Sequence, residues 1–296
     1  MHERESWCLN RNVGRSLKLA KRRHKSQVIF LTGAASGIGA ATAKQLIDQG
    51  DVVILADINV EGAKRIAAGL GERAHVAELD ITSSAAWDRA LDATIERFER
   101  IDVLINNAAI VITGNARALS VDQHRRTHET NFIGPLTGML AALQRFRAQG
   151  HGHIVTICSM TSFLPSPGIA SYGASKQALR AFHHAIALEE RHEPIDFTIV
   201  HPTATETPML ELEEQDDSCS FAFVAEPVTA DVVAATIVAA IAKKSIEVCM
   251  PPEQARTIQR LGTDAKQLRK MYDQIEMFGK EAQRLRREKH RAELRG

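Results

Sequence analysis

Tyr172 and Lys176 form the side-chain pair in this 296-residue sequence that is best suited to moving a proton. On a helix, their four-residue spacing projects both side chains from the same face. A free phenol titrates near pH 10, and a neighbouring ammonium stabilises its phenolate. Lowering that pKa by roughly three units requires about 4 kcal/mol. The pair therefore predicts a general acid/base for an alcohol–carbonyl pair, although the spacing also arises by chance about one time in ten.

A glycine-rich turn, Thr32–Gly39, joins two segments of different periodicity. The apolar run 27–31 before it is typical of a strand buried on both faces, and residues 40–49 after it follow a helical pattern. Strand, turn and helix in this order direct free backbone N–H groups at an anion, and glycine permits an approach that a Cβ would block. The turn predicts a dinucleotide pyrophosphate site. An ordinary tight turn is the alternative, because the G-x-x-x-G-x-G spacing differs from the commonest fingerprint.

An acidic residue ends the next expected strand. Asp57 comes 18 residues after Gly39, where a carboxylate accepts hydrogen bonds from both hydroxyls of an adenosine ribose and repels a 2′-phosphate. No Lys or Arg lies within the glycine turn or just after Asp57 to bind such a phosphate. The sequence therefore favours NAD(H) over NADP(H), and the alternative is a carboxylate that only caps the following turn. A cationic nicotinamide ring near Tyr172 would help to lower the pKa of that phenol.

Seven apolar runs with strand character alternate with helical patterns along the chain. The expected strands are 28–31, 52–56, 74–79, 103–106, 153–158, 196–200 and 246–250, and clear helical stretches are 85–98, 121–148 and 175–191. This alternation predicts an α/β fold with a single Rossmann-type, doubly wound, seven-stranded parallel sheet and helices on both faces. In such a sheet the ligand lies beyond the carboxyl ends of the strands, so residues that follow strands are the candidates for the site.

Three regions are expected along the chain. They are a flexible basic extension over 1–25, a dinucleotide-binding catalytic domain over 26–251, and a charged extension of one or two helices over 252–296. The last of these either covers the segment 208–227 or a partner subunit, or is solvated. Within the domain, 208–227 mixes acidic with apolar residues between a strand and a helix, where a substrate lid would be placed. The apolar side chains that would line a substrate pocket, or only pack this loop, are Met209, Leu210, Phe221 and Phe223.

Composition places the chain among globular proteins, with 44% hydrophobic and 25% charged residues and a formal charge of +1. The charge is uneven. Residues 1–25 carry eight basic against two acidic side chains, and 252–296 carry twelve against seven, so the region between them is net acidic. Basic ends are compatible with attachment to a membrane surface or with solvated termini. They lack interleaved aromatic residues, so no nucleic acid is expected as a partner.

Metal binding and secretion are not indicated. The four cysteines are widely separated and contain no C-x-x-C pair, which argues against disulfides and zinc and suits a reducing cytoplasm. No apolar run approaches 18 residues, and no continuous apolar stretch lies between the basic N-terminus and the first expected strand. His151, His153, His183 and His184 have no carboxylate or cysteine at ligand spacing beside them, so surface or interface positions are favoured over a metal site.

The order and separation of these motifs resemble the classical short-chain dehydrogenase/reductase family over roughly 26–251. The matching positions are Thr32–Gly39, Asp57, Asp80, Asn106-Asn107-Ala108-Ala109, Asn131, Ser159, Tyr172 and Lys176. The resemblance implies an NAD(H)-dependent oxidoreductase that interconverts a secondary alcohol and a ketone of a hydrophobic small molecule, and a homodimer or homotetramer. A non-catalytic dinucleotide-binding sensor or scaffold is the alternative, although a sensor would not need an intact proton relay.

The resemblance also implies roles for single residues. Ser159 would hydrogen-bond the substrate oxygen, Lys176 would hold the nicotinamide ribose, and Asn131 would anchor a water in the proton relay. The residues that would contact the cofactor are Gly33, Ser36, Gly37, Ile38, Gly39, Asp57, Asp80, Ile81, Asn107, Ala108, Tyr172, Lys176, Pro202 and Thr207.

The sequence departs from the family pattern after the sixth expected strand. Pro202-Thr203 stands where the family usually has Pro-Gly, which puts a β-branched side chain where the backbone would approach the nicotinamide. His201, just before this pair, is open between contacting the substrate and packing. A milder departure is Asn107-Ala108-Ala109 in place of Asn-Ala-Gly.

Overall fold

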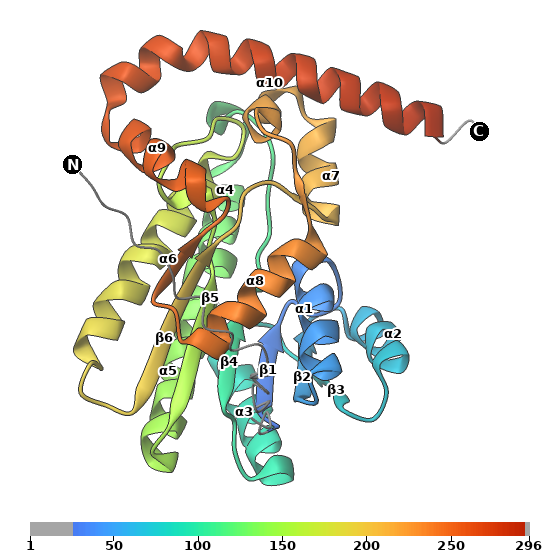
Figure 1. Ribbon diagram of the computed structural model, residues 1–296, viewed down its shortest axis with the longest axis vertical. Coiled ribbons are helices and arrows are strands. Elements are labelled where there is room, and N and C mark those ends of the chain that lie inside the picture. The colour runs from blue at the N-terminus through green and yellow to red at the C-terminus, as the bar shows by residue number, and fades with distance from the viewer. Residues whose placement is uncertain (1–25, 294–296) are drawn as a thin grey trace, which may run out of the picture.

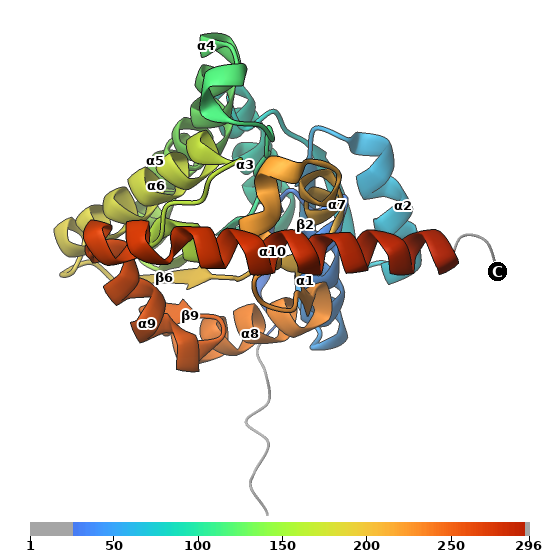
Figure 2. The ribbon, with the colours of Figure 1, turned by 90° about the horizontal axis from the view of Figure 1, so that it is seen from above.

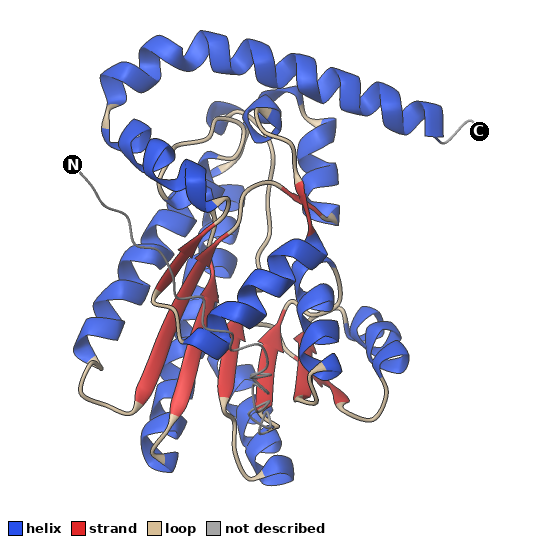
Figure 3. Ribbon diagram, viewed as in Figure 1, coloured by secondary structure: helices blue, strands red, loops and turns tan. Residues whose placement is uncertain are grey.

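The computed structural model describes residues 26–293, so the predictions for 1–25 lie outside the described residues. Seven parallel strands form one sheet in the order β3-β2-β1-β4-β5-β6-β9 (Figure 3). In chain order these strands are β1 (Val28–Thr32), β2 (Val52–Asp57), β3 (Ala74–Glu78), β4 (Val103–Asn106), β5 (Gly152–Ile157), β6 (Ile195–His201) and β9 (Glu247–Cys249). The order reverses between β1 and β4, which confirms the predicted doubly wound sheet.

Helices cover both faces of this sheet (Figure 1). The helices of these two layers are α1 (Gly37–Asp48), α2 (Val60–Leu70) and α8 (Ala230–Lys243) on one face, and α3 (Ser84–Phe98), α5 (Gly134–Gln149) and α6 (Ala170–Glu189) on the other. Strand β1 contributes alternately to the two cores. Ile29 and Leu31 pack with the first set, whereas Val28 and Phe30 pack with the second. A strand buried on both faces has no polar side to show, which explains the uninterrupted apolar run.

The helical stretch expected over 121–148 is present and contains a π-helical turn. It consists of α4 (Val121–His128), a π-helical turn, η2 (Glu129–Ile133), and then α5. Pro135, in the first turn of α5, has no N–H to continue an unbroken ladder of helical hydrogen bonds through this point. The predicted helical stretch is therefore confirmed, with one π-helical irregularity that lies beside the carboxyl end of β4.

The segment 208–227 folds into α7 (Pro208–Gln215) and the 3-10 helix η4 (Asp217–Phe223). Its two flanks are joined by a short parallel pair of strands, β7 (Thr205–Glu206) and β8 (Val228–Thr229). Two-residue strands carry no periodic signal, so the sequence did not predict them. The pairing brings the start and the end of the segment together.

The charged C-terminal region forms two helices, α9 (Pro252–Thr263) and α10 (Ala265–Glu293). Figure 2 shows α10 crossing the end of the molecule at which the strands finish, over α7. Helix α10 approaches η4 closely, because a Cβ at Gly279 of α10 would lie 2.2 Å from the backbone oxygen of Ser220 in η4. The Gln283 amide nitrogen donates to the carbonyls of Glu213 and Glu214 at 3.1 and 3.0 Å. Thus α10 binds the last turn of α7 through the carbonyls that a helix end leaves free.

Arginine side chains strengthen this contact. Arg286 forms two hydrogen bonds with Glu206 at 2.6 and 2.5 Å and a third with Glu214 at 2.7 Å. His290 contacts the other carboxylate oxygen of Glu214 at 3.0 Å. We call the contacts of Gln283, Arg286 and His290 with the segment 205–216 the α10 clamp.

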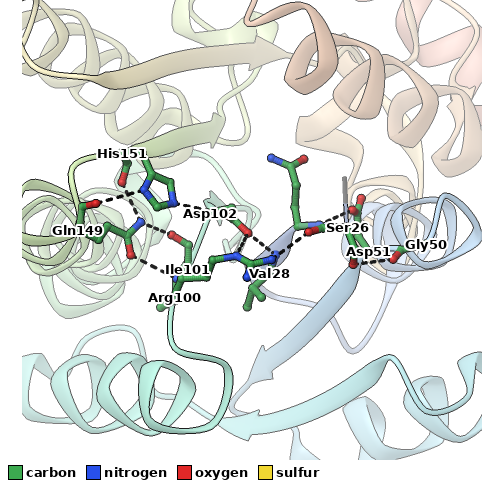
Figure 4. Close-up of polar contacts among 10 residues, drawn as sticks. Ser26, Val28, Gly50, Asp51, Arg100, Ile101, Asp102, Gln149 and His151 are labelled. Carbon is green, nitrogen blue, oxygen red and sulfur yellow. Dashed lines mark hydrogen bonds and ion pairs between the residues drawn. The ribbon is translucent and has the colours of Figure 1, made fainter. Parts of the chain in front are cut away.

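A separate polar network lies at the amino ends of the strands, far from this clamp (Figure 4). The Asp102 carboxylate accepts a hydrogen bond from the backbone N–H of Val28 at 2.7 Å and from Arg100 at 2.9 Å. Its second oxygen lies 3.2 Å from the His151 ring. Because it joins the starts of β1 and β4 to the chain before β5, this network belongs to fold stability.

The histidines predicted at the surface divide into two groups. His151 is exposed, but His153 and His183 are buried, where they hydrogen-bond Thr198 and Thr156 respectively. Burial lowers the pKa of His153 to about 4 and that of His183 to about 3. The prediction of surface or interface positions was therefore wrong for this buried pair, which lies inside the chain. Within residues 26–293 no group of three or more His, Cys, Asp or Glu side chains is placed to hold a metal ion.

Between residues 26 and 293, no helix combines the length and the apolar character needed to cross a membrane. Cys158, Cys219 and Cys249 are free thiols.

Candidate active site

Most of the predicted site residues line one cavity of about 990 Å³ at the carboxyl ends of the strands. They are Gly33, Ser36, Gly37, Ile38, Asp57, Asp80, Ile81, Asn107, Ala108, Ser159, Tyr172, Lys176, Pro202 and Thr207. Gly39 and Asn131 lie behind the cavity wall. Residues separated by up to 174 positions in the chain thus meet because parallel strands end at one edge of the sheet.

The glycine turn fits an anion. Gly33 and Gly37 adopt positive φ angles of 66° and 52°, which glycine accepts without strain. A Cβ at Gly39 would lie only 2.1 Å from the Gly33 carbonyl oxygen, so that position also requires glycine. Helix α1 begins at Gly37, and the side chain of its N-cap residue, Ser36, makes no capping hydrogen bond. The first N–H groups of α1 are therefore available to a phosphate, and the helix dipole favours a negative charge there.

A buried hydroxyl connects this turn to the segment after β4. Thr32 Oγ1 accepts hydrogen bonds from the backbone N–H groups of Asn107 at 3.0 Å and Ala108 at 3.1 Å. In return, the Asn107 amide donates to the carbonyls of Thr32 and Gly33 at 3.0 and 3.1 Å. Ala109, which stands where the family usually has glycine, leaves these hydrogen bonds intact. Thr32 was not predicted as a functional residue, although its place at the end of a buried strand was a usable signal.

Asp57 lies at the end of β2, beside the glycine turn. One carboxylate oxygen accepts from the Ala35 N–H at 2.9 Å and the other from the Asn59 N–H at 2.8 Å. The Asp57 side chain therefore caps the following turn, as the alternative predicted, and also lies on the cavity wall. The two bonds fix the carboxylate where the ribose of a dinucleotide would lie, and each oxygen retains a further lone pair for a ribose hydroxyl.

Asp80 and Ile81 follow β3 at the same end of the cavity. Asp80 is exposed, and one of its carboxylate oxygens accepts from the Thr82 N–H at 2.9 Å and from the Thr82 hydroxyl at 2.7 Å. Ile81 is buried and would clash with any Cβ at Gly134. The pair combines a polar rim with an apolar floor, which suits the edge and the face of a purine.

The three residues expected to act on the substrate converge at the other end of the cavity. Ser159 follows β5 directly, and its hydroxyl hydrogen-bonds the phenol of Tyr172, in the first turn of α6. Lys176 lies one helical turn further, with Nζ 5.6 Å from the centroid of the Tyr172 ring. Its ammonium donates to the carbonyl of Ile157 at 3.0 Å. Helix α6 therefore presents the phenol and the ammonium to the end of β5, as their spacing predicted.

The expected direction of the Tyr172 pKa was wrong for the protein chain alone. Burial of the phenol, reinforced by the nearby charges of Glu213 and Cys158, raises the pKa of Tyr172. The hydrogen bond from Ser159 acts in the opposite direction but is weaker. Burial also lowers the pKa of Lys176. The spacing of the two residues predicted the nearby ammonium but not the burial of the phenol, which disfavours the phenolate. A further positive charge is therefore needed to lower the pKa of Tyr172.

Asn131, in the π-helical turn, is fully buried. Its side-chain amide donates to the Ile110 carbonyl at 2.8 Å and accepts from the Ile110 N–H at 2.8 Å. Asn131 thus joins the irregular turn to the chain that follows β4 and shapes the cavity from behind. The proton-relay role implied for it stays a prediction.

Thr203, which stands where the family usually has glycine, does not need a positive φ angle. Glu99 and Lys244 are the non-glycine residues with positive φ among those described, so Thr203 has an ordinary φ. Pro202 accepts a hydrogen bond from the Met160 N–H at 2.9 Å, and Thr207 packs against Gly37. These contacts hold the chain after β6 against both the glycine turn and the segment carrying Ser159.

His201 is buried behind the cavity rather than facing it. Its Nδ1 lies 2.9 Å from the Ser162 hydroxyl, and its Nε2 lies 3.0 Å from the Glu247 carboxylate. Burial opposes a charge on this ring, but hydrogen bonds to Cys158 and Glu247 prevail and raise the pKa of His201 to about 9. Of the two roles left open for His201, the structure shows packing.

The wall beyond Tyr172 is apolar and comes from regions that motif analysis did not cover. Segment 208–227 contributes three of the predicted side chains, Met209, Leu210 and Phe221, whereas Phe223 is buried inside the segment. Further side chains come from the C-terminal helices, namely Ile258 and Leu261 of α9 and Ile275 of α10. The sparse apolar residues of the charged C-terminal region left open whether it covers the segment 208–227, covers a partner subunit or is solvated, and the structure places it at the cavity.

Comparison with known proteins agrees with this geometry. Residues 27–218 match the family model described as short chain dehydrogenase. The chain belongs to the short chain dehydrogenase family. It is accordingly an oxidoreductase acting on CH–OH groups with NAD(P) as the acceptor, as its motifs predicted.

Two curated relatives illustrate the similarity. The 2,5-dichloro-2,5-cyclohexadiene-1,4-diol dehydrogenase of Sphingobium indicum is 33% identical over 186 residues, which is 62% of this chain and 74% of the relative. The 3-alpha-(or 20-beta)-hydroxysteroid dehydrogenase of Mycobacterium tuberculosis is 30% identical over 190 residues, which is 64% of this chain and 73% of the relative.

Two solved structures share the fold. A short chain dehydrogenase/reductase from Burkholderia phymatum in complex with NAD has a TM-score of 0.75 at 22% identity, covering 81% of this chain and 93% of its own. The 3-ketoacyl-(acyl-carrier-protein) reductase of Brucella melitensis with NADH has a TM-score of 0.70 at 25% identity, covering 77% and 98%.

Proposed function

We propose that this short chain dehydrogenase is an NAD(H)-dependent oxidoreductase that interconverts a secondary alcohol and a ketone. The observation that carries the proposal is the convergence of a Ser159–Tyr172 hydrogen bond and the Lys176 ammonium on one cavity. That cavity also contains an open helix N-terminus behind Gly33 and Gly37. Acid/base groups and a phosphate cradle in a single space are what hydride transfer with a dinucleotide requires.

Ser159, Tyr172 and Lys176 have separate roles in the oxidation. Ser159 holds the substrate oxygen by a hydrogen bond, and Tyr172 accepts the hydroxyl proton. Lys176 holds positive charge one helical turn from the phenol. A bound NAD⁺ would supply the acceptor for the hydride released by the alcohol carbon, and its ring charge would add the positive charge that the protein alone lacks for acidifying Tyr172. In the reverse direction Tyr172 returns the proton to the ketone oxygen.

The preference for NAD(H) rests on Asp57. Its carboxylate is fixed by Ala35 and Asn59 on the cavity wall, so it cannot easily move away from a 2′-phosphate. Two negative groups at this position repel each other, whereas ribose hydroxyls donate to the carboxylate.

An apolar substrate is supported by the wall built from α7, η4 and the C-terminal helices. The names of the relatives point in the same direction, because one acts on a hydroxysteroid and the other on a cyclic diol. We infer a hydrophobic, ring-containing alcohol or ketone, with segment 208–227 acting as the lid over it. We also infer a homodimer or homotetramer in the cytoplasm, supported by the exposed Leu140 of α5 and Leu188 of α6 and by the free thiols.

The function is tested with a panel of secondary alcohols that ranges from cyclohexanol to hydroxysteroids. Each alcohol is mixed with the protein and NAD⁺, and the absorbance of NADH is followed. The proposal expects turnover of at least one cyclic alcohol and tighter binding of NADH than of NADPH. A protein that binds NADH but oxidises no alcohol and reduces no ketone across the panel would instead be the non-catalytic dinucleotide-binding protein.

A further inference from the structure

Glu213, on α7, has a carboxyl group without a partner on the wall of the substrate cavity. The residue is 8% exposed and lines the cavity beyond Tyr172. Within residues 26–293 its carboxylate takes part in no hydrogen bond or ion pair, whereas that of the adjacent Glu214 binds Arg286 and His290. A buried carboxylate is normally paired, because removing its charge from water is costly. Burial accordingly raises the pKa of Glu213 to about 7.

The surroundings of Glu213 show which part of the cavity it serves. Its charge acts on the phenol of Tyr172 and on the thiol of Cys219. Cys219 packs with Val111 and Ile169 in a small apolar cluster that also contacts Tyr172. The carboxyl therefore lies on the substrate side of the cavity and is surrounded there by apolar side chains. It is remote from the Asp57 end, where the adenosine would bind.

The α10 clamp fixes the backbone of Glu213. Gln283 donates to the carbonyls of Glu213, Glu214 and Asp216, at 3.1, 3.0 and 2.9 Å. Gln283 is itself buried. Gln283 of α10 thus holds this turn of α7 in place, and Figure 2 shows α10 crossing over α7. An arrangement that holds an unpaired carboxyl on the wall of the cavity that contains the reacting phenol is a preorganised polar contact for a ligand.

We propose that Glu213 binds a hydrogen-bond donor of the substrate, a hydroxyl or an ammonium, that is distinct from the alcohol or ketone that reacts at Tyr172. The inference rests on the proposed function and narrows its substrate class to bifunctional molecules, such as diols, hydroxyketones or amino alcohols. The apolar walls bind the carbon skeleton, and Glu213 selects among skeletons by the second polar group. A substrate that lacks this donor leaves the carboxyl buried and unpaired, and so binds less well.

Matched compounds test the proposal. Cyclohexanol, the cyclohexane-1,3- and 1,4-diols, and 4-aminocyclohexanol are oxidised with NAD⁺ by wild-type protein and by Glu213→Gln and Glu213→Leu. Glutamine keeps a hydrogen-bond acceptor and loses the charge, whereas leucine loses both. Glu211→Leu, an exposed position on the same helix, is the control that should behave as wild type.

In wild type we expect kcat/KM for a diol or the amino alcohol to exceed that for cyclohexanol by about ten- to hundredfold, the range of a hydrogen bond to a charged group. Glu213→Leu should abolish this ratio. If Glu213→Gln keeps the ratio for the diols alone, the group that Glu213 binds is a hydroxyl. If Glu213→Gln loses the ratio for the amino alcohol, Glu213 binds the ammonium of that compound. An unchanged ratio in Glu213→Leu overturns the proposal.

Calorimetry separates failure of this proposal from failure of the proposed function. The same compounds are titrated into the protein with NADH bound, which requires no turnover. Tighter binding of a diol or the amino alcohol to wild type than to Glu213→Leu supports the role of Glu213 even if nothing is oxidised. Equal binding of every compound by the two proteins refutes it, whatever their activity.

Discussion

The pH dependence of stability provides a quantitative prediction for Glu213. Its pKa is about 7 in the folded protein and 4.5 when unperturbed. The folded state thus binds this proton more tightly than the unfolded state does, so ionisation of Glu213 destabilises the fold as the pH rises through this range. One pKa unit is worth about 1.4 kcal/mol, which makes the destabilisation about 3 kcal/mol at about pH 9. Below about pH 4.5 it disappears, because the carboxyl is protonated in both states.

Glu213→Gln removes this destabilisation and keeps the shape of the side chain. Urea unfolding should show a variant more stable than wild type by about 3 kcal/mol at about pH 9, with the difference falling below about 1 kcal/mol at about pH 5. Glu211→Gln, exposed on the same helix, should show no such trend. A difference that is independent of pH, or a variant less stable at high pH, would mean that Glu213 is paired in the folded protein. That result would refute the description of its environment.

Three further substitutions test separate parts of the structure. Asp57→Asn should improve NADPH binding relative to NADH by about tenfold because it removes the charge repulsion, and fluorescence titration with unchanged relative affinities would contradict this. Arg286→Ala should weaken the α10 clamp by about 1 to 2 kcal/mol, seen as about tenfold faster hydrogen exchange in α7. Arg284→Ala is its control, since the ion pairs of Arg284 with described residues lie within α10, and equal exchange in both variants would show that the clamp does not hold α7. Asp102→Ala should lower the free energy of unfolding by about 2 kcal/mol without changing kcat/KM, because Asp102 lies at the end of the sheet opposite the cavity. A lower kcat/KM of the folded variant would contradict a purely structural role for Asp102.

The sheet was predictable because its signals are local. Each buried strand, such as Val28–Thr32, shows an apolar run of strand length before a turn or a helical pattern, and parallel pairing follows from the alternation. The π-helical turn Glu129–Ile133 and the short β7–β8 pair were not predictable, because they depend on contacts between distant segments. The packing of α10 across α7 has the same origin, since few apolar residues mark its buried side.

The candidate site shows the same division. The spacing of Tyr172 and Lys176 was enough to place them one turn apart on one helix, and the family resemblance added Ser159 beside them. The sequence did not show how deeply the phenol is buried, and the direction of its pKa was therefore wrong. It also did not reveal Glu213, because an acidic residue in a mixed helix has no motif. Its burial depends on Gln283, 70 residues later in the chain.

The central claim is that Tyr172 exchanges the proton of the reacting alcohol in a dinucleotide-binding cavity. The most direct measurement compares wild type with Tyr172→Phe, using an alcohol that the wild type oxidises and NADH titration on the same preparations. Removal of the hydroxyl should lower kcat by at least about a thousandfold, within the range of general acid–base catalysis, and leave the Kd for NADH within about threefold of wild type. If the phenylalanine variant turns over at a rate close to that of wild type, another group moves the proton and the role assigned to Tyr172 is wrong.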